Sequence, residues 1–343
     1  MLTEKELPIK YPMITSLPAF ANMTAILCTH EDVFFPWLCH NHVQLVAWET
    51  PEVYIQFYTP VFREHYRLFV LHHYHKNVLV KWCDNITQFI IDAIDEENYV
   101  YLSIDQYYIA AYDNFRRVHT PHDMLIYGYN KENQMFYVAD FFNSKYSFSK
   151  ASFNSVNGAF LSPHSEGEWF KGVQLLQFNE RKSEFKFDLA YLIKQLHEYL
   201  HEKKSSNDYK LIEEPGKDTD AWGIGVYRFL RKHITENALF EFSLIRSLHL
   251  LFDHKEVMLR SLVFLDEKKY ITRFDFHEKA YGEIKQLCLI LRNLCIKHSI
   301  SEKTNHIKNI IELIEKIENE ERIAVQELLS DLEEVEKNLA EVD

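Results

Sequence analysis

Two polar residues beside neighbouring apolar runs are the strongest candidates for chemistry in this chain. In the stretch "HTPHDMLIYGYNKENQMFYVADFF", His122 stands before one apolar run and Asp140 ends the next, 18 residues later. The turn-like "NKEN" between the runs predicts a β-hairpin, which brings the two residues near each other. A carboxylate beside an imidazole can hold the ring in the tautomer that a general base requires. The alternative is that both are ordinary polar residues flanking a turn.

A thiol nucleophile would complete this arrangement, and two cysteines lie early enough in the chain to supply it. Cys28 precedes Thr29-x-x-Asp32, a pattern typical of a helix start, where the positive helix end lowers a thiol pKa. However, "PAFANMTAILC" can itself be the helix, which leaves Cys28 at its far end. Cys39 lies in a first helical turn if Pro36 begins that helix. Either cysteine can instead be a core residue, which leaves no nucleophile.

The elements that must position these residues change in character near residue 184. Before it, the sequence predicts one helix in "NITQFIIDAIDEE" and strands in "NYVYLSIDQYYIAAY", "DMLIYGY", "QMFYVAD", "KYSFSKASF" and "GVQLLQFN". After it, the apolar period becomes that of long amphipathic helices, the first of them capped by Asp188. We therefore predict an α+β fold with a mostly antiparallel sheet in a domain at residues 1–183, followed by an all-helical bundle domain at residues 184–343.

Composition excludes several classes of partner. The net charge of -13 and a pI near 5.8 argue against nucleic acid or an anionic membrane. The N-terminus has no apolar signal region, and no run approaches the ~20 apolar residues that span a bilayer. Five widely spaced cysteines do not indicate a disulfide framework, and Cys83, Cys288 and Cys295 are expected to be structural. We predict a cytoplasmic protein with reduced thiols.

Metal binding is not expected from the histidine clusters. "CHNH" at residues 39–42 and "HHYH" at residues 72–75 lack the paired spacing of common zinc sites. With 18 histidines in the chain, clusters of this kind arise by chance. The sequence analysis therefore predicts no metal and no cofactor.

The succession "VYLSIDQYYI", "HTPHDMLIYGYN" and "MFYVADFF" resembles the core of papain-like cysteine protease homologues. More narrowly, it resembles the butirosin biosynthesis protein H-like acyltransferases of antibiotic and nonribosomal peptide assembly lines, over about residues 15 to 180. The resemblance implies a papain-like first domain with a Cys–His–Asp arrangement, in which His122 is the base and Asp140 orients it. It also makes Asn22, six residues before Cys28, a candidate for the oxyanion hole.

The resemblance further implies an activity. Such enzymes take an acyl group from a phosphopantetheinyl acyl or peptidyl carrier protein, hold it on a cysteine, here Cys28, and pass it to a small amine to form an amide. Two alternatives remain open at this point. One is a catalytically silent papain-like scaffold that binds an assembly-line partner, and the other is a cysteine peptidase or hydrolase.

Overall fold

The structure of the chain is a computed structural model. It describes residues 2–49, 52–58, 68–167, 170–180, 185–208, 220–237, 242–301 and 305–341. The chain forms two compact units. The first comprises residues 1–12, 17–30 and 63–183, and the second comprises residues 13–16, 31–62 and 184–343. Each unit is described by itself.

The second unit includes segments that precede the predicted domain boundary. The predicted boundary between residues 183 and 184 lies outside the described residues. Segment 31–62, which the sequence analysis placed in the first domain, groups with the second unit. It does so because its helix α2 (Glu31–Asn41) and its strand β3 (Val53–Phe57) both pack on helix α8 (Phe242–Glu267).

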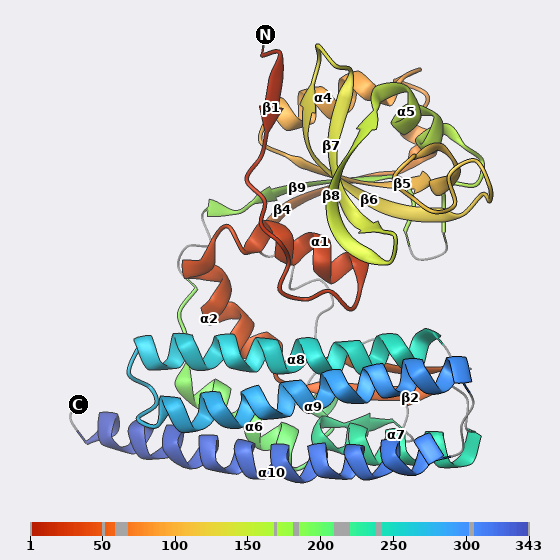
Figure 1. The fold of residues 1–343 in the computed structure, drawn as a ribbon. Helices are drawn as coiled ribbons and strands as arrows, with labels where there is room; N and C mark the ends of the chain where they lie inside the picture. The colour runs from red at the N-terminus through yellow and green to blue at the C-terminus, as the bar shows by residue number, and fades with distance from the viewer. Residues whose placement is uncertain are drawn as a thin grey trace. The chain divides into compact units, whose positions relative to one another are not determined.

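Within the described residues, seven strands form the sheet of the first unit, and all their pairings are antiparallel. The strand order is β4-β9-β5-β6-β7-β8, and the short β1 pairs with the end of β6. Figure 1 shows the strong twist of this sheet. The strands are β1 (Glu4–Glu6), β4 (Phe69–Tyr74), β5 (Tyr99–Asp105), β6 (Pro121–Asn130), β7 (Met135–Phe142), β8 (Lys145–Ser152) and β9 (Val173–Phe178).

The α+β class and the antiparallel sheet predicted from the sequence are thus confirmed, but the strand bounds differ. The strand expected to run from residue 98 to 112 ends at Asp105. Its carboxylate accepts a hydrogen bond from the backbone N–H of Tyr107, which starts a 3-10 turn at Gln106–Tyr108 and diverts the chain. The loop that follows carries Tyr112 before β6 begins.

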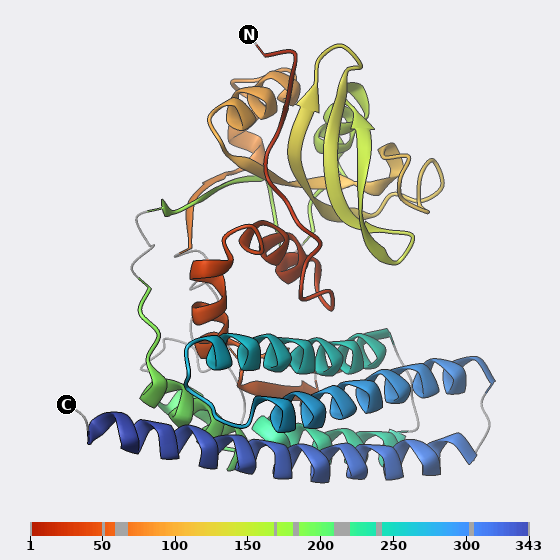
Figure 2. The ribbon, with the colours of Figure 1, turned by 60° about the vertical axis from the view of Figure 1, so that its left-hand side comes forward.

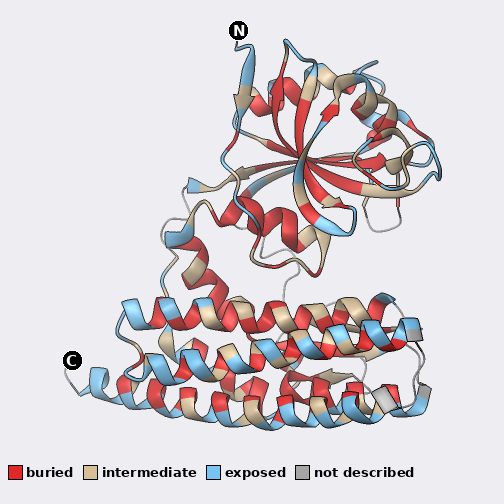
Figure 3. Ribbon diagram, viewed as in Figure 1, coloured by how far each residue is buried: buried red, intermediate tan, exposed pale blue. Residues whose placement is uncertain are grey.

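Helices cover the central strands of this sheet. β5 is buried along its whole length, because α4 and α5 pack on it, and α1 packs on β7. Figure 3 shows the buried residues concentrated in these strands and in the helix faces that meet them. Asn85 and Ser152 cap α4 and α5 by accepting backbone N–H groups. The helices are α1 (Pro18–Leu27), α3 (Lys76–Leu79), α4 (Ile86–Asp95) and α5 (Phe153–Leu161).

Long helices make up most of the second unit, and Figure 2 shows α8, α9 and α10 lying alongside one another. Asp188 caps α6 as predicted, accepting the N–H of Tyr191 at 3.0 Å. The unit also contains an antiparallel three-stranded sheet of described residues, which the sequence analysis did not place there. The helices and strands of the second unit are α2, β2 (Leu45–Glu49), β3, α6 (Leu189–Leu200), β10 (Ala221–Trp222), α7 (Val226–Asn237), α8, α9 (Phe274–Ser301) and α10 (Asn305–Ala340).

A buried carboxylate joins four helices of the second unit. Glu321 of α10 is fully buried and accepts hydrogen bonds from Lys255 of α8, Tyr199 of α6 and Tyr227 of α7. Burial, followed by the charge of Glu321, raises the tyrosine pKa values, so both hydroxyls stay protonated donors. Across the described residues, every helix is too short or too polar to span a bilayer.

We predict that Gly128→Ala destabilises the first unit. The pairing of β6 with β7 shifts register between Ile126 and Gly128, where β1 also pairs. A Cβ atom on Gly128 would lie 2.6 Å from the backbone oxygen of Lys5 and 2.8 Å from the Tyr137 ring. Overpacking of this kind costs about 1–3 kcal/mol. Urea denaturation followed by circular dichroism measures the loss.

Gly282→Ala in α9 is the matched control. Nothing lies within 4 Å of its added Cβ, and alanine favours a helix over glycine by about 1 kcal/mol. We therefore expect a small gain in the free energy of unfolding of the second unit. Equal effects of the two substitutions would contradict the close packing at Gly128.

Candidate functional site

The register of β6 and β7 places His122 and Asp140 on one face of the sheet. Leu125 pairs with Ala139. Continuing that register sets Asp140 across from Met124, two residues from His122 on the same side of β6. Diagonal neighbours of this kind are within reach of one another's side chains. The hairpin therefore brings the two together without any contribution from distant segments.

The imidazole and the carboxylate are in direct contact. Nε2 of His122 lies 2.9 Å from Oδ2 of Asp140, whose side chain is completely buried. Tyr112 donates its hydroxyl to the same oxygen, and its ring meets the His122 ring edge-on at 5.7 Å. Burial and then the negative charge of Asp140 raise the Tyr112 pKa well above its usual value, so this hydroxyl is a permanent donor.

This geometry sets the chemistry that His122 can perform. A carboxylate acceptor at Nε2 holds a proton there and leaves the lone pair on Nδ1. The side chain of His122 is 19% exposed, so a reactant can reach it. An oriented neutral imidazole with an available nitrogen can take a proton from a thiol or an amine.

Tyr146 of β8 pairs with Phe141, so by strand alternation its side chain lies on the opposite face of the sheet from Asp140. Asn22 of α1 meets this tyrosine. Its Oδ1 accepts a hydrogen bond from the hydroxyl of Tyr146 at 3.0 Å, and burial and then the charge of Asp140 raise the pKa of that tyrosine. Asn22 is 1% exposed, and its Nδ2 has no hydrogen-bond partner among the described residues. The same holds for Oδ1 of Asp140. One unused donor, on Asn22, and one unused acceptor, on Asp140, are therefore buried, and the strand register sets them on different faces of the sheet.

Cys28 stands at the opposite end of α1 from the one a nucleophile needs. α1 spans Pro18–Leu27, and Cys28 is its C-cap residue, with its N–H bonded to the carbonyl of Thr24. Thr29 donates its hydroxyl back to Ile26 instead of capping the next helix. The helix end beside Cys28 thus presents carbonyl oxygens, whose partial negative charge disfavours a thiolate.

Helix geometry also separates Cys28 from Asn22. Six residues along a helix amount to about 9 Å of rise and a rotation of about 240°. Since Asn22 meets Tyr146, the side chain of Cys28 points elsewhere. The structure therefore brings His122 and Asp140 together, places Asn22 beside Tyr146, and sets Cys28 at the C-terminal end of α1. The role of Cys28 as the nucleophile stays a prediction.

The other cysteines do not replace Cys28. Pro36 lies inside α2 and not at its start, so Cys39 is in the C-terminal half of that helix, in the second unit. Burial raises the pKa values of Cys39, Cys288 and Cys295 to about 12. Cys83 is partly exposed, and all five cysteines, each a described residue, are free of disulfides.

Sequence reasoning missed a second buried aspartate that binds a histidine. Asp105 accepts hydrogen bonds from Nδ1 of His119 at 2.6 Å and from the hydroxyl of Ser162 at 2.7 Å. Burial tends to raise the pKa of Asp105, but these bonds and the N–H groups of Tyr107 and Thr120 outweigh it and hold the pKa below its usual value. Both oxygens of Asp105 are bonded, which is typical of a structural network.

Tyr112 and Tyr146 were also missed, and no local signal marks them. Each lies in a stretch crowded with aromatic residues, and only the folded sheet shows which hydroxyl reaches Asp140 or Asn22. The sequence analysis also missed a motif that is visible in the sequence. "HEYLH" at residues 197–201 has the His-Glu-x-x-His spacing of helical zinc sites. The prediction of no metal site overlooked it.

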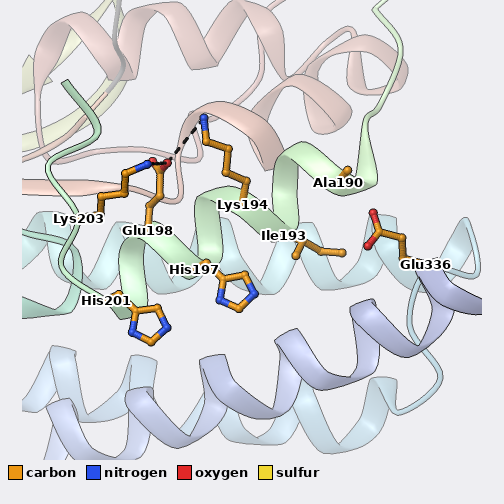
Figure 4. Close-up of a pocket in the computed structure, with 8 residues that line it drawn as sticks. All are labelled: Ala190, Ile193, Lys194, His197, Glu198, His201, Lys203 and Glu336. Carbon is orange, nitrogen blue, oxygen red and sulfur yellow. Dashed lines mark hydrogen bonds and ion pairs between the residues drawn. The ribbon is translucent and has the colours of Figure 1, made fainter. Parts of the chain in front are cut away.

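This sequence lines a groove of the second unit. The groove has a volume of about 460 Å³ and lies on α6, with Glu336 of α10 at its edge (Figure 4). Among the described residues, no three His, Cys, Asp or Glu side chains are grouped as metal ligands.

Comparison with known proteins adds no relative. No family model matches the chain, and no curated protein sequence matches it significantly. The resemblance drawn from the "HTPHDMLIYGYN" region therefore stays a hypothesis, and the function must be argued from the geometry.

Thiol reactivity tests the placement of the cysteines. In the native protein at pH 8, we expect iodoacetamide to modify Cys83 first, because Cys28 is only 7% exposed and Cys39, Cys288 and Cys295 are deeply buried. The buried thiols should react only on unfolding. Mass spectrometry of tryptic peptides identifies the modified residue.

A Cys83→Ala variant serves as the control, since it should leave the native protein almost unreactive. Modification of Cys28 faster than Cys83 would contradict this reading and indicate an activated thiol.

Proposed function

We propose that the first unit is an acyltransferase of thiotemplated natural-product biosynthesis, in which His122, oriented by Asp140, is the general base. The observation that carries this proposal is the 2.9 Å contact between Nε2 of His122 and Oδ2 of the buried Asp140, which leaves Nδ1 available. The resemblance of the hairpin to amide-forming acyltransferases supplies the reaction class.

The incomplete bonding around Asp140 supports a reactive site over a purely structural pair. Asp105 uses both oxygens, whereas Oδ1 of Asp140 and Nδ2 of Asn22 are buried without partners among the described residues. Unsatisfied buried groups are uncommon in folded proteins, and a catalytic role is one of the explanations for such a group. The amine substrate, which carries N–H donors, could use the unused Oδ1 of Asp140.

The proposed reaction moves an acyl group from a carrier-protein thioester to an amine. The amine nitrogen attacks the thioester carbonyl while Nδ1 of His122 takes the amine proton. The tetrahedral oxyanion then collapses, the C–S bond breaks, and the carrier thiolate recovers the proton from His122. Atoms and charges balance with a free carrier thiol and an amide as products.

The position of Cys28 favours this direct transfer over an acyl-enzyme route. Cys28 lies at the carbonyl end of α1, where a thiolate is disfavoured. In the acyl-enzyme route, Nδ1 of His122 would first take the Cys28 proton, and the thioester on Cys28 would then be attacked by the amine. Both routes need His122, and only the second needs the cysteine.

A catalytically silent scaffold is the second candidate, and the placement of the cysteines favours it. Cys28 is at the wrong end of its helix, and burial holds the Cys39 thiol protonated. In that case the His122–Asp140 pair would stabilise a protein that binds the carrier without reacting.

The proposed partners are a phosphopantetheinyl carrier protein and a small amine. We place the reaction in the cytoplasm, because none of the five cysteines, which lie in the described part of the chain, is in a disulfide.

Single substitutions separate the three possibilities. With an acylated carrier and a panel of small amines, we expect His122→Ala to reduce amide formation by about 10²–10⁴-fold. Asp140→Asn should reduce it less, because its role is to orient the ring. Cys28→Ala should retain activity. Intact-protein mass spectrometry of the carrier measures acyl loss, and the amide is quantified in parallel.

His119→Ala is the matched control, because it removes a nearby histidine that is held by Asp105. It should leave amide formation unchanged. Loss of activity in Cys28→Ala would establish the acyl-enzyme route instead. If the intact protein forms no amide with any amine yet binds the carrier, the silent scaffold is correct.

A further inference from the structure

The side chains of His197 and His201 project from the same side of α6. They are four residues apart in "HEYLH", and their rings are nearly parallel, with planes 6° and centroids 5.9 Å apart. Figure 4 shows both rings on the side of α6 that faces α10. Two histidines at this spacing on one helix face are a frequent chelating pair for zinc.

The ring separation suits an ion held between the two. A Zn²⁺–nitrogen bond is about 2.0–2.1 Å long, which places the ion roughly 3.2 Å from the centre of each imidazole ring. Rings that share an ion therefore have centroids at most about 6.4 Å apart. The observed 5.9 Å lies within that limit, and rotation of the two parallel rings would be needed to point one nitrogen of each at a shared ion.

The nitrogens needed for coordination are accessible. His201 is exposed, and no hydrogen bond to a described residue occupies its ring. The side chain of His197 is 44% exposed, and Nε2 lies 2.7 Å from Oε1 of Glu333 in α10. A carboxylate on one nitrogen of a histidine orients the ring and makes the other nitrogen a better metal ligand.

The surrounding charge also favours a cation. His201 is the C-cap residue of α6, so the partial negative charge of the helix end lies beside it. Glu336 borders the groove. The two nearby lysines do not oppose this, because Glu198 pairs with Lys203 at 2.8 Å and with Lys194 at 3.7 Å.

We propose that His197 and His201 form a binding site for one divalent transition-metal ion, with Glu333 orienting His197 and with water as the remaining ligands. The protein supplies only two direct ligands, consistent with the absence of any group of three among the described residues. The site belongs to the second unit and is independent of the function proposed for the first.

The same geometry argues against a metallopeptidase. In peptidases with this motif, the glutamate after the first histidine is the general base that activates a metal-bound water. Here Glu198 is 4% exposed and also accepts the hydroxyl of Ser205 at 2.6 Å. Figure 4 shows it directed toward the lysines, away from both imidazole rings. We therefore expect this site to bind a metal ion without hydrolysing a peptide.

Calorimetric titration of the full chain with Zn²⁺ tests the proposal. We expect one equivalent to bind tightly enough to be resolved from weaker sites. His197→Ala and His201→Ala should each weaken that event by at least about tenfold, and Glu333→Gln by about tenfold. Each substituted side chain is partly or fully exposed, so circular dichroism should show an intact fold.

His72→Ala, which removes an exposed histidine from β4, is the matched control and should leave the titration unchanged. The proposal is wrong if the intact protein shows no resolved Zn²⁺ event, or if the His201 variant binds as tightly as the control.

Discussion

The hydrogen-bond register between β6 and β7 is the constraint on which the first unit depends. Because side chains alternate along a strand, a slip of one residue would move Asp140 to the other face of the sheet, away from His122. The ladder from Leu125–Ala139 to Ile126–Val138 fixes that register, and β1 pairs with β6 from Gly128 onward, beyond the residues that pair with β5. The sheet core and the candidate site therefore share one set of backbone hydrogen bonds.

Desolvation of carboxylates links this site to the rest of the fold. A buried carboxylate is costly unless hydrogen bonds replace its water. Asp105 recovers that cost with bonds to both oxygens, and Glu321 does so with a lysine and two tyrosines from separate helices. Asp140 has His122 and Tyr112 on one oxygen only. This asymmetry distinguishes a candidate reactive site from two structural ones.

The second unit uses the two faces of α6 for different purposes. One face carries Tyr199 into the network around Glu321, which fixes the helix against its neighbours. The other carries His197 and His201 toward solvent, where Glu333 of α10 reaches His197. Because α6 is held by the buried face, the exposed histidines have a fixed backbone spacing, as a chelating pair requires.

Local patterns were sufficient where neighbours in sequence are also neighbours in space. The hairpin, the cap at Asp188 and the α+β class follow from turn residues, capping chemistry and apolar period, all of which act over a few residues. The position of Cys28 relative to the first helix was left open. "PAFANMTAILC" can form a helix that ends at Cys28, whereas the pattern after Cys28 is typical of a helix start. Local propensity does not decide between them.

The tertiary structure decided what depends on packing across long separations. It placed Cys28 at the end of α1 and moved segment 31–62 to the second unit, where its apolar side chains find a partner in α8. It also selected Tyr112 as the second donor to Asp140, from among many tyrosines of similar sequence context. The sequence alone determined which residues could do chemistry. Burial and strand pairing determined which of them meet, because desolvation and side-chain contact act through space and not along the chain.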